Sequence, residues 1–222
     1  KEKAIVYKSR YEASIAKDKN CLGSYVFLWG QKQERTPTWY GLFTEAGEES
    51  EVIDVMHFLW KGKWPKNRAP RLDSLLLNDK QATDIIYLKP THNYAVAAFV
   101  VDPDKDDLKA RWELLQESTD LKEGGDREDR PVSLTNHITA TTLKEATLQA
   151  PQKEGAYRLF VYVTDGNNHV ATANIPFYVS SQEKPTHEGL KNMLSSAVKY
   201  DFSTQTSWAD EFDYIGLPDS SR

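Results

Sequence analysis

The sequence has little cysteine and no long apolar run, and both scarcities limit what the chain can be. Cys21 is the only cysteine among 222 residues, which excludes an intrachain disulfide and a thiolate zinc cluster. Mean hydropathy is -0.64, and the apolar runs are far shorter than the ~20 residues that cross a bilayer. Residues 1–8 also lack the apolar stretch of a secretory signal. We therefore expect no membrane span and a chain that is a mature or excised segment.

The sequence also has no excess of positive charge. Lysine and arginine number 28 against 33 aspartate and glutamate residues, which gives a formal net charge of -5. Affinity for nucleic acid comes mainly from cations that neutralise phosphates. We therefore expect no nucleic-acid partner.

Signatures of common enzymes are missing as well. The sequence contains no G-x-S-x-G elbow, no P-loop, no G-x-G-x-x-G fingerprint and no H-E-x-x-H zinc motif. We therefore predict no catalytic residue in this chain. The histidines are scattered singly, none has a second histidine at ligand spacing, and we interpret all five as structural or surface residues: His57, His92, His137, His169 and His187.

The first 60 residues show helical and strand patterns in turn. Apolar and aromatic residues recur at a spacing near 3.6 over residues 2–17 and again over residues 48–60, which predicts two amphipathic helices. Consecutive apolar residues over 21–29 predict a strand that is covered on both faces, as in an α/β sheet. Residues 30–38 are polar and predict a loop. The predicted order is therefore helix, buried strand, loop and helix.

The pattern changes after residue 64. Residues 65–70 carry the proline and asparagine punctuation of a linker. Alternating runs separated by turn residues then predict an immunoglobulin-like β-sandwich, with Trp112 in its core and a tight turn at residues 165–168. The predicted strands cover residues 73–77, 85–88, 94–101, 108–115, 133–139, 156–164 and 169–179.

The fold class predicted from these patterns is an α+β multidomain chain. Residues 1–64 form its α/β segment, residues 65–70 the linker and residues 71–180 the sandwich. Residues 181–222 are predicted to form a short C-terminal helix followed by an acidic and aromatic tail.

The stretch from residue 29 to residue 40 combines flat aromatic rings with amides and charges. A pyranose ring has an apolar C–H face that stacks on tryptophan, and its hydroxyls form hydrogen bonds with amides and carboxylates. The alternative is that both tryptophans pack in the core or against a helix and that the polar residues cap the next helix. The candidates for glycan binding are Trp29, Gln31, Gln33, Glu34 and Trp39.

The run from Leu22 to Phe43 resembles the last strand and loop of the (β/α)8 catalytic barrel in glycoside hydrolases similar to family 2. The resemblance implies that Trp29 ends the eighth strand and lines a sugar subsite, and that the two predicted helices are the seventh and eighth barrel helices. Such proteins occur in polysaccharide-degrading bacteria, so the resemblance implies a periplasmic or extracellular location. Residues 67–70, 101–106 and 163–167 are similar to motifs of cadherin-like or polycystic-kidney-disease-like bacterial modules.

The chain departs from the family in its catalytic groups. A retaining glycosidase needs two carboxyl groups about 5 Å apart, and the family carries them on the fourth and seventh barrel strands, which this sequence does not contain. The resemblance thus implies the C-terminal portion of a carbohydrate-active glycoside hydrolase, which contributes one wall of a glycan site and an accessory sandwich and is not catalytic alone. Its partners would be an oligo- or polysaccharide and the remainder of the parent enzyme or another protein chain. Two alternatives are a stand-alone carbohydrate-binding or adhesion module and a spacer without a ligand.

Three aspartates lie at alternating positions near the middle of the predicted sandwich. Asp102, Asp104 and Asp106 supply hard oxygen ligands, which suit Ca²⁺. The same residues also make a tight polar turn without a metal. The spacing lacks the glycine and distal glutamate of an EF-hand, and the family resemblance implies a glycine where Lys105 stands. We therefore expect no cofactor except, as an alternative, calcium at these three residues.

Overall fold

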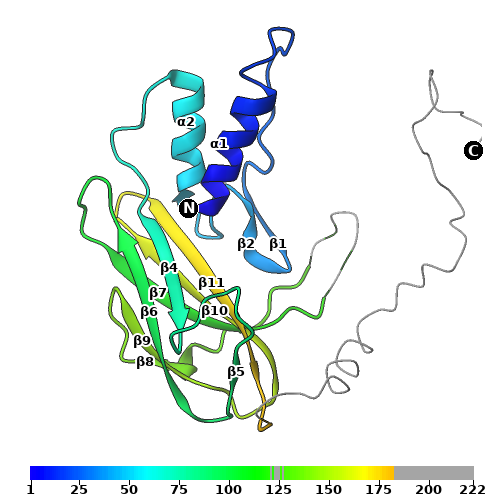
Figure 1. Cartoon of the computed structure of the whole chain (residues 1–222), viewed down its shortest axis with the longest axis vertical. Coiled ribbons are helices and arrows are strands. Elements are labelled where there is room, and N and C mark those ends of the chain that lie inside the picture. The colour runs from blue at the N-terminus through cyan, green and yellow to red at the C-terminus, as the bar shows by residue number, and fades with distance from the viewer. Residues whose placement is uncertain (121, 123–125, 127, 183–222) are drawn as a thin grey trace, which may run out of the picture. The chain divides into compact units, whose positions relative to one another are not determined.

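The computed structural model describes residues 1–120, 122, 126 and 128–182. These residues form one compact unit that is mostly β-sheet, with two helices beside a pair of sheets (Figure 1). None of the helices in the described residues is long and apolar enough to cross a membrane. The predicted C-terminal helix and tail fall within residues 181–222, and all but the first two of these residues lie outside the described part of the chain.

Both predicted N-terminal helices are confirmed, as α1 (Glu2–Ser14) and α2 (Glu51–Lys61). Gly62 caps the C-terminus of α2, and its N–H donates to the carbonyl of Phe58. Its φ of 70° is left-handed, and glycine is the residue that adopts this conformation at little cost. Trp60 closes the apolar pattern that predicted this helix, but it is 48% exposed rather than buried. The helices pack through a small core of Ala4, Leu42, Val52, Val55 and Met56.

The predicted buried strand over residues 21–29 is wrong. These residues form no strand, whereas residues expected to form the following loop build a hairpin of β1 (Gln31–Glu34) and β2 (Thr36–Gly41). A strand buried in a parallel sheet needs a hydrogen-bonded neighbour on each side, and the described part of the chain gives residues 21–29 none. Leu22 and Tyr25 are consequently fully exposed. The described residues contain no (β/α)8 unit.

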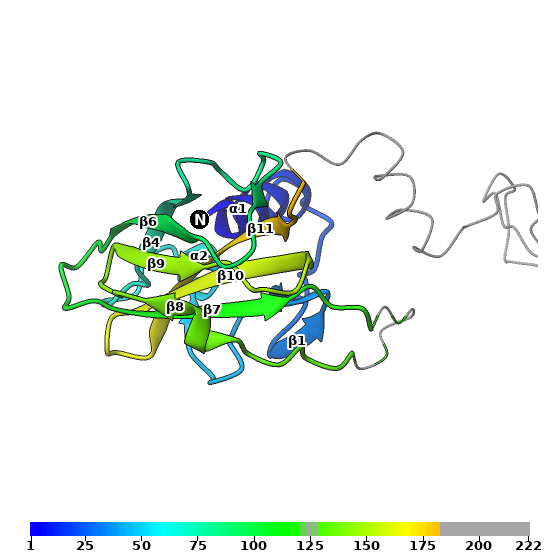
Figure 2. The same ribbon diagram turned by 90° about the horizontal axis from the view of Figure 1, so that it is seen from below.

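The sandwich consists of two sheets that face each other (Figure 2). One sheet has the order β3, β11, β10, β7, with β5 also paired to β11, and the other has the order β4, β6, β9, β8. The strand bounds are β3 Glu49–Ser50, β4 Arg71–Leu77, β5 Tyr87–Leu88, β6 Asn93–Val101, β7 Lys109–Gln116, β8 Ile138–Thr139, β9 Glu145–Gln149, β10 Gly155–Thr164 and β11 His169–Val179.

Most of the predicted strands are confirmed, and two strands of the sandwich sheets, β3 and β9, were missed. Residues 133–139 form the 3-10 turn Thr135–His137 and the short β8 rather than one long strand, and β9 was not predicted. Trp112 lies in the core as expected, 5% exposed, and its indole N–H donates to the carbonyl of Thr142 at 3.1 Å. The tight turn at residues 165–168 joins β10 to β11 as predicted.

Strand β10 is buried on both faces. Leu159 and Val161 belong to the core between the sheets, whereas Phe160 and Tyr162 form a second small cluster on the opposite face. The predicted alternation of inward and outward residues is therefore right for the inner face, but the outer face is not solvated. Residues from the N-terminal segment lie against this face, since Pro37 and Tyr162 border the same small pocket.

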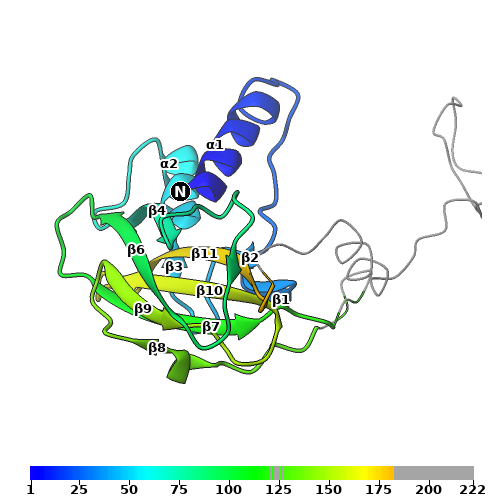
Figure 3. The ribbon, with the colours of Figure 1, turned by 60° about the horizontal axis from the view of Figure 1, so that its bottom comes forward.

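The N-terminal segment is joined to the sandwich through the residues of the predicted linker. Strand β3 pairs in parallel with the start of β11, and Ala69 and Pro70 are buried. Asp54 of α2, 1% exposed, accepts a hydrogen bond from the backbone N–H of Ala69 at 2.8 Å. Figure 3 shows both helices on one side of the sandwich. The domain boundary at residues 65–70 stays a prediction. The pairing of β3 with β11 joins chain segments on its two sides.

We expect the stability of the protein to depend on pH through Asp54. Burial raises the pKa of Asp54 to about 6, against the opposing effect of the hydrogen bond from Ala69. The folded protein therefore binds a proton more tightly than the unfolded chain, and this contribution to stability is lost as pH rises from about 4 to about 6. The unfolding free energy of Asp54→Asn minus that of the wild type should increase by on the order of 2 kcal/mol when the pH is raised from 4 to 7. Urea denaturation at the two pH values measures this difference.

Asp54→Ala is the contrasting variant. It removes the acceptor of the buried Ala69 N–H and should cost about 1–3 kcal/mol at pH 4, where Asp54→Asn is nearly neutral. Equal effects of Asp54→Asn at pH 4 and pH 7 would show that the carboxyl group titrates normally.

Candidate functional site

The β1–β2 hairpin turns at a single residue. Arg35 lies between Glu34 and Thr36 with a left-handed φ of 59°. Its backbone N–H donates to Oε2 of Glu128 at 2.6 Å, and Glu128 is only 2% exposed. A buried carboxylate that follows β7 in the sequence therefore fixes the turn of the N-terminal hairpin.

A groove of about 1380 Å³ lies between α1, residues 24–27 and the hairpin. It exceeds the ~300–1,000 Å³ of a typical small-molecule pocket, which favours an extended ligand. None of the lining residues that the structure describes is Asp or Glu. They are Lys3, Val6, Tyr7, Arg10, Tyr11, Ser14, Ile15, Ser24, Tyr25, Val26, Phe27, Arg35, Thr36, Thr38, Trp39, Tyr40, Met56, Arg158 and Asn174.

Trp39 is the predicted glycan residue that lines this groove. It is 53% exposed, and its ring stacks on Tyr40 with centroids 5.1 Å apart and planes inclined by 24°. Tyr40 in turn carries the Nζ atom of Lys32 5.9 Å from its ring centroid. One face of a large flat ring is thus fixed by packing, while more than half of the residue remains accessible.

The other four candidates do not line the groove. Trp29 is 61% exposed and meets Phe43 edge to face at 5.2 Å. Gln31 donates its amide N–H to the carbonyl of Pro37 at 3.2 Å. The structure therefore does not gather the predicted set into one site: Trp29 precedes the hairpin, and Gln31 contacts Pro37 within it. Of the remaining two, Glu34 pairs with Lys32, and both amide atoms of Gln33 are buried without a hydrogen-bond partner.

The groove carries basic side chains, and two of its polar groups are partly buried. The Lys3 ammonium donates to the carbonyl of Gly41, and burial lowers the pKa of Lys3 to about 8. The Tyr7 hydroxyl donates to the carbonyl of Phe27, and burial raises the pKa of Tyr7 above its usual value, against the effect of Arg10. Both groups are held by backbone carbonyls rather than by carboxylates.

Sequence reasoning missed the cations of the groove. Lys3 and Arg10 lie seven residues apart on α1, with Tyr7 and Ser14 on the same stripe of the helix. That spacing could have predicted a basic stripe on the helix. The helix prediction used only the apolar and aromatic residues of this segment. Arg158 comes from β10 and has no such signal, because no local pattern places a strand residue next to a helix 150 residues earlier.

The three aspartates predicted to bind calcium lie in the loop between β6 and β7. One carboxylate oxygen from each of the three residues lies within 4.8 Å of the other two. Oδ1 of Asp102 accepts the backbone N–H groups of Asp104 at 2.9 Å and Asp106 at 3.0 Å. Lys105, between them, has a left-handed φ of 66°, a conformation that favours the glycine implied by the family resemblance.

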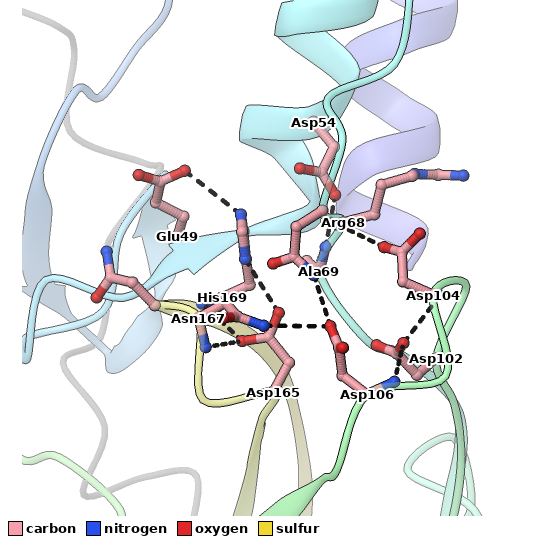
Figure 4. A network of polar contacts seen from close by, with 12 residues as sticks. Glu49, Asp54, Arg68, Ala69, Asp102, Asp104, Asp106, Asp165, Asn167 and His169 are labelled. Atoms are coloured by element: carbon pink, nitrogen blue, oxygen red, sulfur yellow. Dashed lines mark hydrogen bonds and ion pairs between the residues drawn. The ribbon is translucent and has the colours of Figure 1, made fainter.

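The same carboxylates hold the predicted linker and the β10–β11 turn (Figure 4). Oδ2 of Asp104 accepts the backbone N–H of Arg68 at 2.7 Å. Oδ2 of Asp106 accepts the side-chain amide of Asn67 at 2.6 Å and that of Asn167 at 3.3 Å. The loop is therefore a tight polar junction of three chain segments, whether or not it holds a metal.

Several oxygens of this junction are left without a partner. Oδ2 of Asp102 and Oδ1 of Asn67 are buried and accept no hydrogen bond. Among the described residues, no ion pair is formed by Asp102, Asp104 or Asp106. A hard cation with six to eight oxygen ligands suits such a set of oxygens.

His169 lies beside this junction, between two further carboxylates (Figure 4). Its Nδ1 is 3.0 Å from Oδ2 of Asp165, and its Nε2 is 3.8 Å from Oε2 of Glu49. Oδ1 of Asp165 accepts the backbone N–H groups of Asn167 at 2.7 Å and of His169 at 3.2 Å. The side chain of Asp165 is fully buried and anchors the turn through these hydrogen bonds. The contact of the turn with Glu49 of β3 runs through His169.

Comparison with known proteins finds solved structures that are similar to part of this chain. No known protein family and no curated protein matches the chain. A nucleoside hydrolase-related hypothetical protein from Saccharophagus degradans that is associated with carbohydrate metabolism matches with a TM-score of 0.35 and 18% identity, over 58% of this chain and 30% of that chain.

Two further solved structures match the chain over about half its length. The PKD1 domain of Vibrio anguillarum Epp has a TM-score of 0.28 and 14% identity, over 53% of this chain and 100% of that chain. PcoC, a methionine-rich copper resistance protein from Escherichia coli, has a TM-score of 0.29 and 16% identity, over 50% of this chain and 99% of that chain. The functional argument below therefore depends on the geometry of this chain.

Asp165→Ala should destabilise the protein by about 2–3 kcal/mol, because the variant loses a buried acceptor of three hydrogen bonds. Asp165→Asn keeps one acceptor oxygen and should cost less. Urea denaturation at pH 7 measures both, and an Asp165→Ala midpoint equal to that of the wild type would contradict the anchoring role.

Proposed function

We propose that residues 1–64 form one wall of a glycan site in a carbohydrate-active glycoside hydrolase and that the β-sandwich is its accessory module. The observation that carries the proposal is Trp39, which lies exposed at a large groove and is stacked on Tyr40. Pyranose C–H faces pack on such rings because they are apolar and carry a small positive charge toward the π face. A flat ring whose back is already packed loses little freedom when a sugar stacks on it.

The composition of the groove supports the same proposal. Tyr7, Tyr11 and Tyr25 add rings with hydroxyl groups, and Thr36 and Thr38 add short hydroxyls. Sugars are recognised by this combination of stacking surface and hydrogen-bonding groups. The volume of about 1380 Å³ allows an oligosaccharide or the end of a polysaccharide chain.

The proposal also gives the exposed apolar side chains a partner. Leu22 is fully exposed, and an exposed apolar side chain of this size suits a contact with another protein. Tyr25 and Phe27 are also exposed, but they line the groove and stay available to the glycan. We propose that the remainder of the parent enzyme, or another protein chain, packs on Leu22 and supplies the catalytic carboxyl pair. Such an enzyme would act in the periplasm or outside the cell.

The alternative of a stand-alone binding module requires a row of exposed aromatic residues on a sheet face. Trp112 and Tyr162 are buried, at 5% and 3% exposed, and Tyr94 is half-buried, with its hydroxyl accepting the N–H of Lys89. Phe99 is exposed on β6. The aromatic positions therefore favour the hairpin over the sandwich as the sugar-binding surface.

Trp39→Ala should weaken glycan binding by about 3- to 10-fold, the effect of losing one aromatic stacking surface. A glycan array followed by calorimetry on the best ligand measures the change. Trp60→Ala is the matched control, because Trp60 is 48% exposed on α2 and does not line the groove. Equal affinities of the two variants, or an array on which the wild type binds no glycan, would overturn the proposal.

A second proposal concerns calcium at Asp102, Asp104 and Asp106. It is supported by the mutual proximity of the three carboxylates and by the partnerless oxygens of Asp102 and Asn67. A bound Ca²⁺ would relieve the repulsion between the carboxylates and would tie the predicted linker to the β6–β7 loop.

Millimolar CaCl₂ should raise the melting temperature of the protein, whereas MgCl₂ should not, because Mg²⁺ demands an octahedral site and gives up its water reluctantly. Asp104→Asn keeps an acceptor for Arg68 and should reduce calcium affinity at least tenfold. Asp107→Asn removes the same charge one residue beyond the cluster and should leave the affinity unchanged. A melting temperature that does not respond to CaCl₂ would refute the calcium site.

A further inference from the structure

We infer that the ligand of the groove is an anionic oligosaccharide whose sugar rings carry carboxylate or sulfate groups. This inference rests on the proposed glycan function and adds the chemical class of the ligand. It is carried by the distribution of charge around the groove, to which Lys3, Arg10, Arg35 and Arg158 contribute.

The charge of the groove is the reverse of that of the whole chain. Acidic residues outnumber basic ones by 33 to 28 in the sequence, yet the described lining of the groove holds four cations and no Asp or Glu. Neutral sugars are usually bound with the help of carboxylates that accept hydrogen bonds from the sugar hydroxyls. A groove with cations alone is instead suited to ligand groups that are themselves negative.

The four cations differ in how far their charge is already compensated. Arg158 is held by Glu117 at 2.7 Å and by Asn174 at 2.6 Å, so it is part of the scaffold. Lys3 donates to a carbonyl, which leaves its positive charge uncompensated. Burial lowers the pKa of Lys3 to about 8, which reports the cost of holding this ammonium without an anion.

Arg10 and Arg35 are the cations available to a ligand. Within the described part of the chain, neither guanidinium forms an ion pair or a hydrogen bond. Only the backbone N–H of Arg35 is engaged, by the buried carboxylate of Glu128. Because a guanidinium presents a planar fork of donors, each of these side chains can bind a carboxylate or a sulfate through two parallel hydrogen bonds.

Cations and aromatic rings line the groove together. Arg10 lies on the same stripe of α1 as Tyr7, and the hairpin contributes both Arg35 and Trp39. A polymer of charged sugars presents an apolar ring face and an anionic group in every residue. The lining therefore matches both features of such a polymer, whereas a neutral glycan would leave the guanidinium groups without partners.

The test compares anionic ligands with uncharged saccharides, including one pair that differs by esterification of its carboxylates, with the full chain as the receptor. We would measure the affinity of a galacturonic acid hexamer, its methyl ester, a sulfated carrageenan hexamer, cellohexaose and a 12-residue oligothymidylate by calorimetry at 50 mM NaCl. The galacturonate hexamer should bind at least tenfold more tightly than its methyl ester, and 1 M NaCl should reduce this difference to about threefold or less. The tighter of the galacturonate and carrageenan hexamers identifies the carboxylate or the sulfate as the preferred group.

Arg10→Gln and Arg35→Gln should each weaken binding of the preferred anionic hexamer by about 5- to 10-fold and leave binding of the methyl ester unchanged. Lys66→Gln is the matched control, because it removes one exposed positive charge outside the groove and should have no effect.

Each other outcome has a definite meaning. Equal binding of the galacturonate hexamer and its methyl ester would overturn the anionic class while the proposed glycan function stands. No binding of any saccharide would overturn the glycan function itself. Tighter binding of oligothymidylate than of every saccharide would assign the groove to single-stranded nucleic acid, which also binds to rings and cations, and would overturn both.

Discussion

Burial of β10 on both faces is the constraint on which the rest of the structure depends. The inner residues Leu159 and Val161 fill the sandwich core, and the outer residues Phe160 and Tyr162 are equally inaccessible. Large aromatic rings on an outer face lose their stabilising burial if that face meets water. The segment before the sandwich must therefore stay in place against this strand, and that requirement also fixes the hairpin and the groove.

Polar contacts at the outer face match this burial. Glu113, next to Phe160 in the sheet register, is 5% exposed and accepts a hydrogen bond from Arg130 at 2.8 Å. Arg130 in turn is 3.1 Å from Glu45 of the N-terminal segment. Burial, together with Glu113, raises the pKa of Tyr162 to about 12. A buried glutamate is tolerated here because its charge is paired, and the pairing extends to both parts of the chain.

Local patterns in the sequence correctly predicted the features that depend on short-range interactions. The helices follow from apolar spacing, the turn at residues 165–168 from glycine and asparagine, and the core position of Trp112 from alternation. The strand expected at residues 21–29 failed because its apolar residues describe a burial that needs neighbouring strands, and the described chain has none to offer. Burial inside a sheet is a property of several segments at once, so a single segment cannot reveal it.

The candidate site divides in the same way. Trp39 and the three aspartates were visible in the sequence because stacking rings and clustered carboxylates are recognisable by residue type. The grouping of Trp29, Gln31, Gln33 and Glu34 with Trp39 was not realised, since closeness in the sequence does not determine which side chains meet: Trp29 contacts Phe43, and Glu34 pairs with Lys32. Glu128 contacts the hairpin from more than 90 residues away, and Arg158 reaches the groove from β10; only the folded chain shows this.

The contact between Glu128 and Arg35 bears on how the protein could be divided or recombined. Sandwich modules are often treated as units that can be exchanged between proteins. In this chain, Glu128 accepts the backbone N–H of Arg35 and so fixes a turn of the N-terminal hairpin. Transplanting the sandwich alone would leave an orphaned acid in the new host and a loosened hairpin in the donor. A fragment designed for transfer to another protein must therefore contain both Glu128 and Arg35. It has to include the N-terminal segment as well as the sandwich.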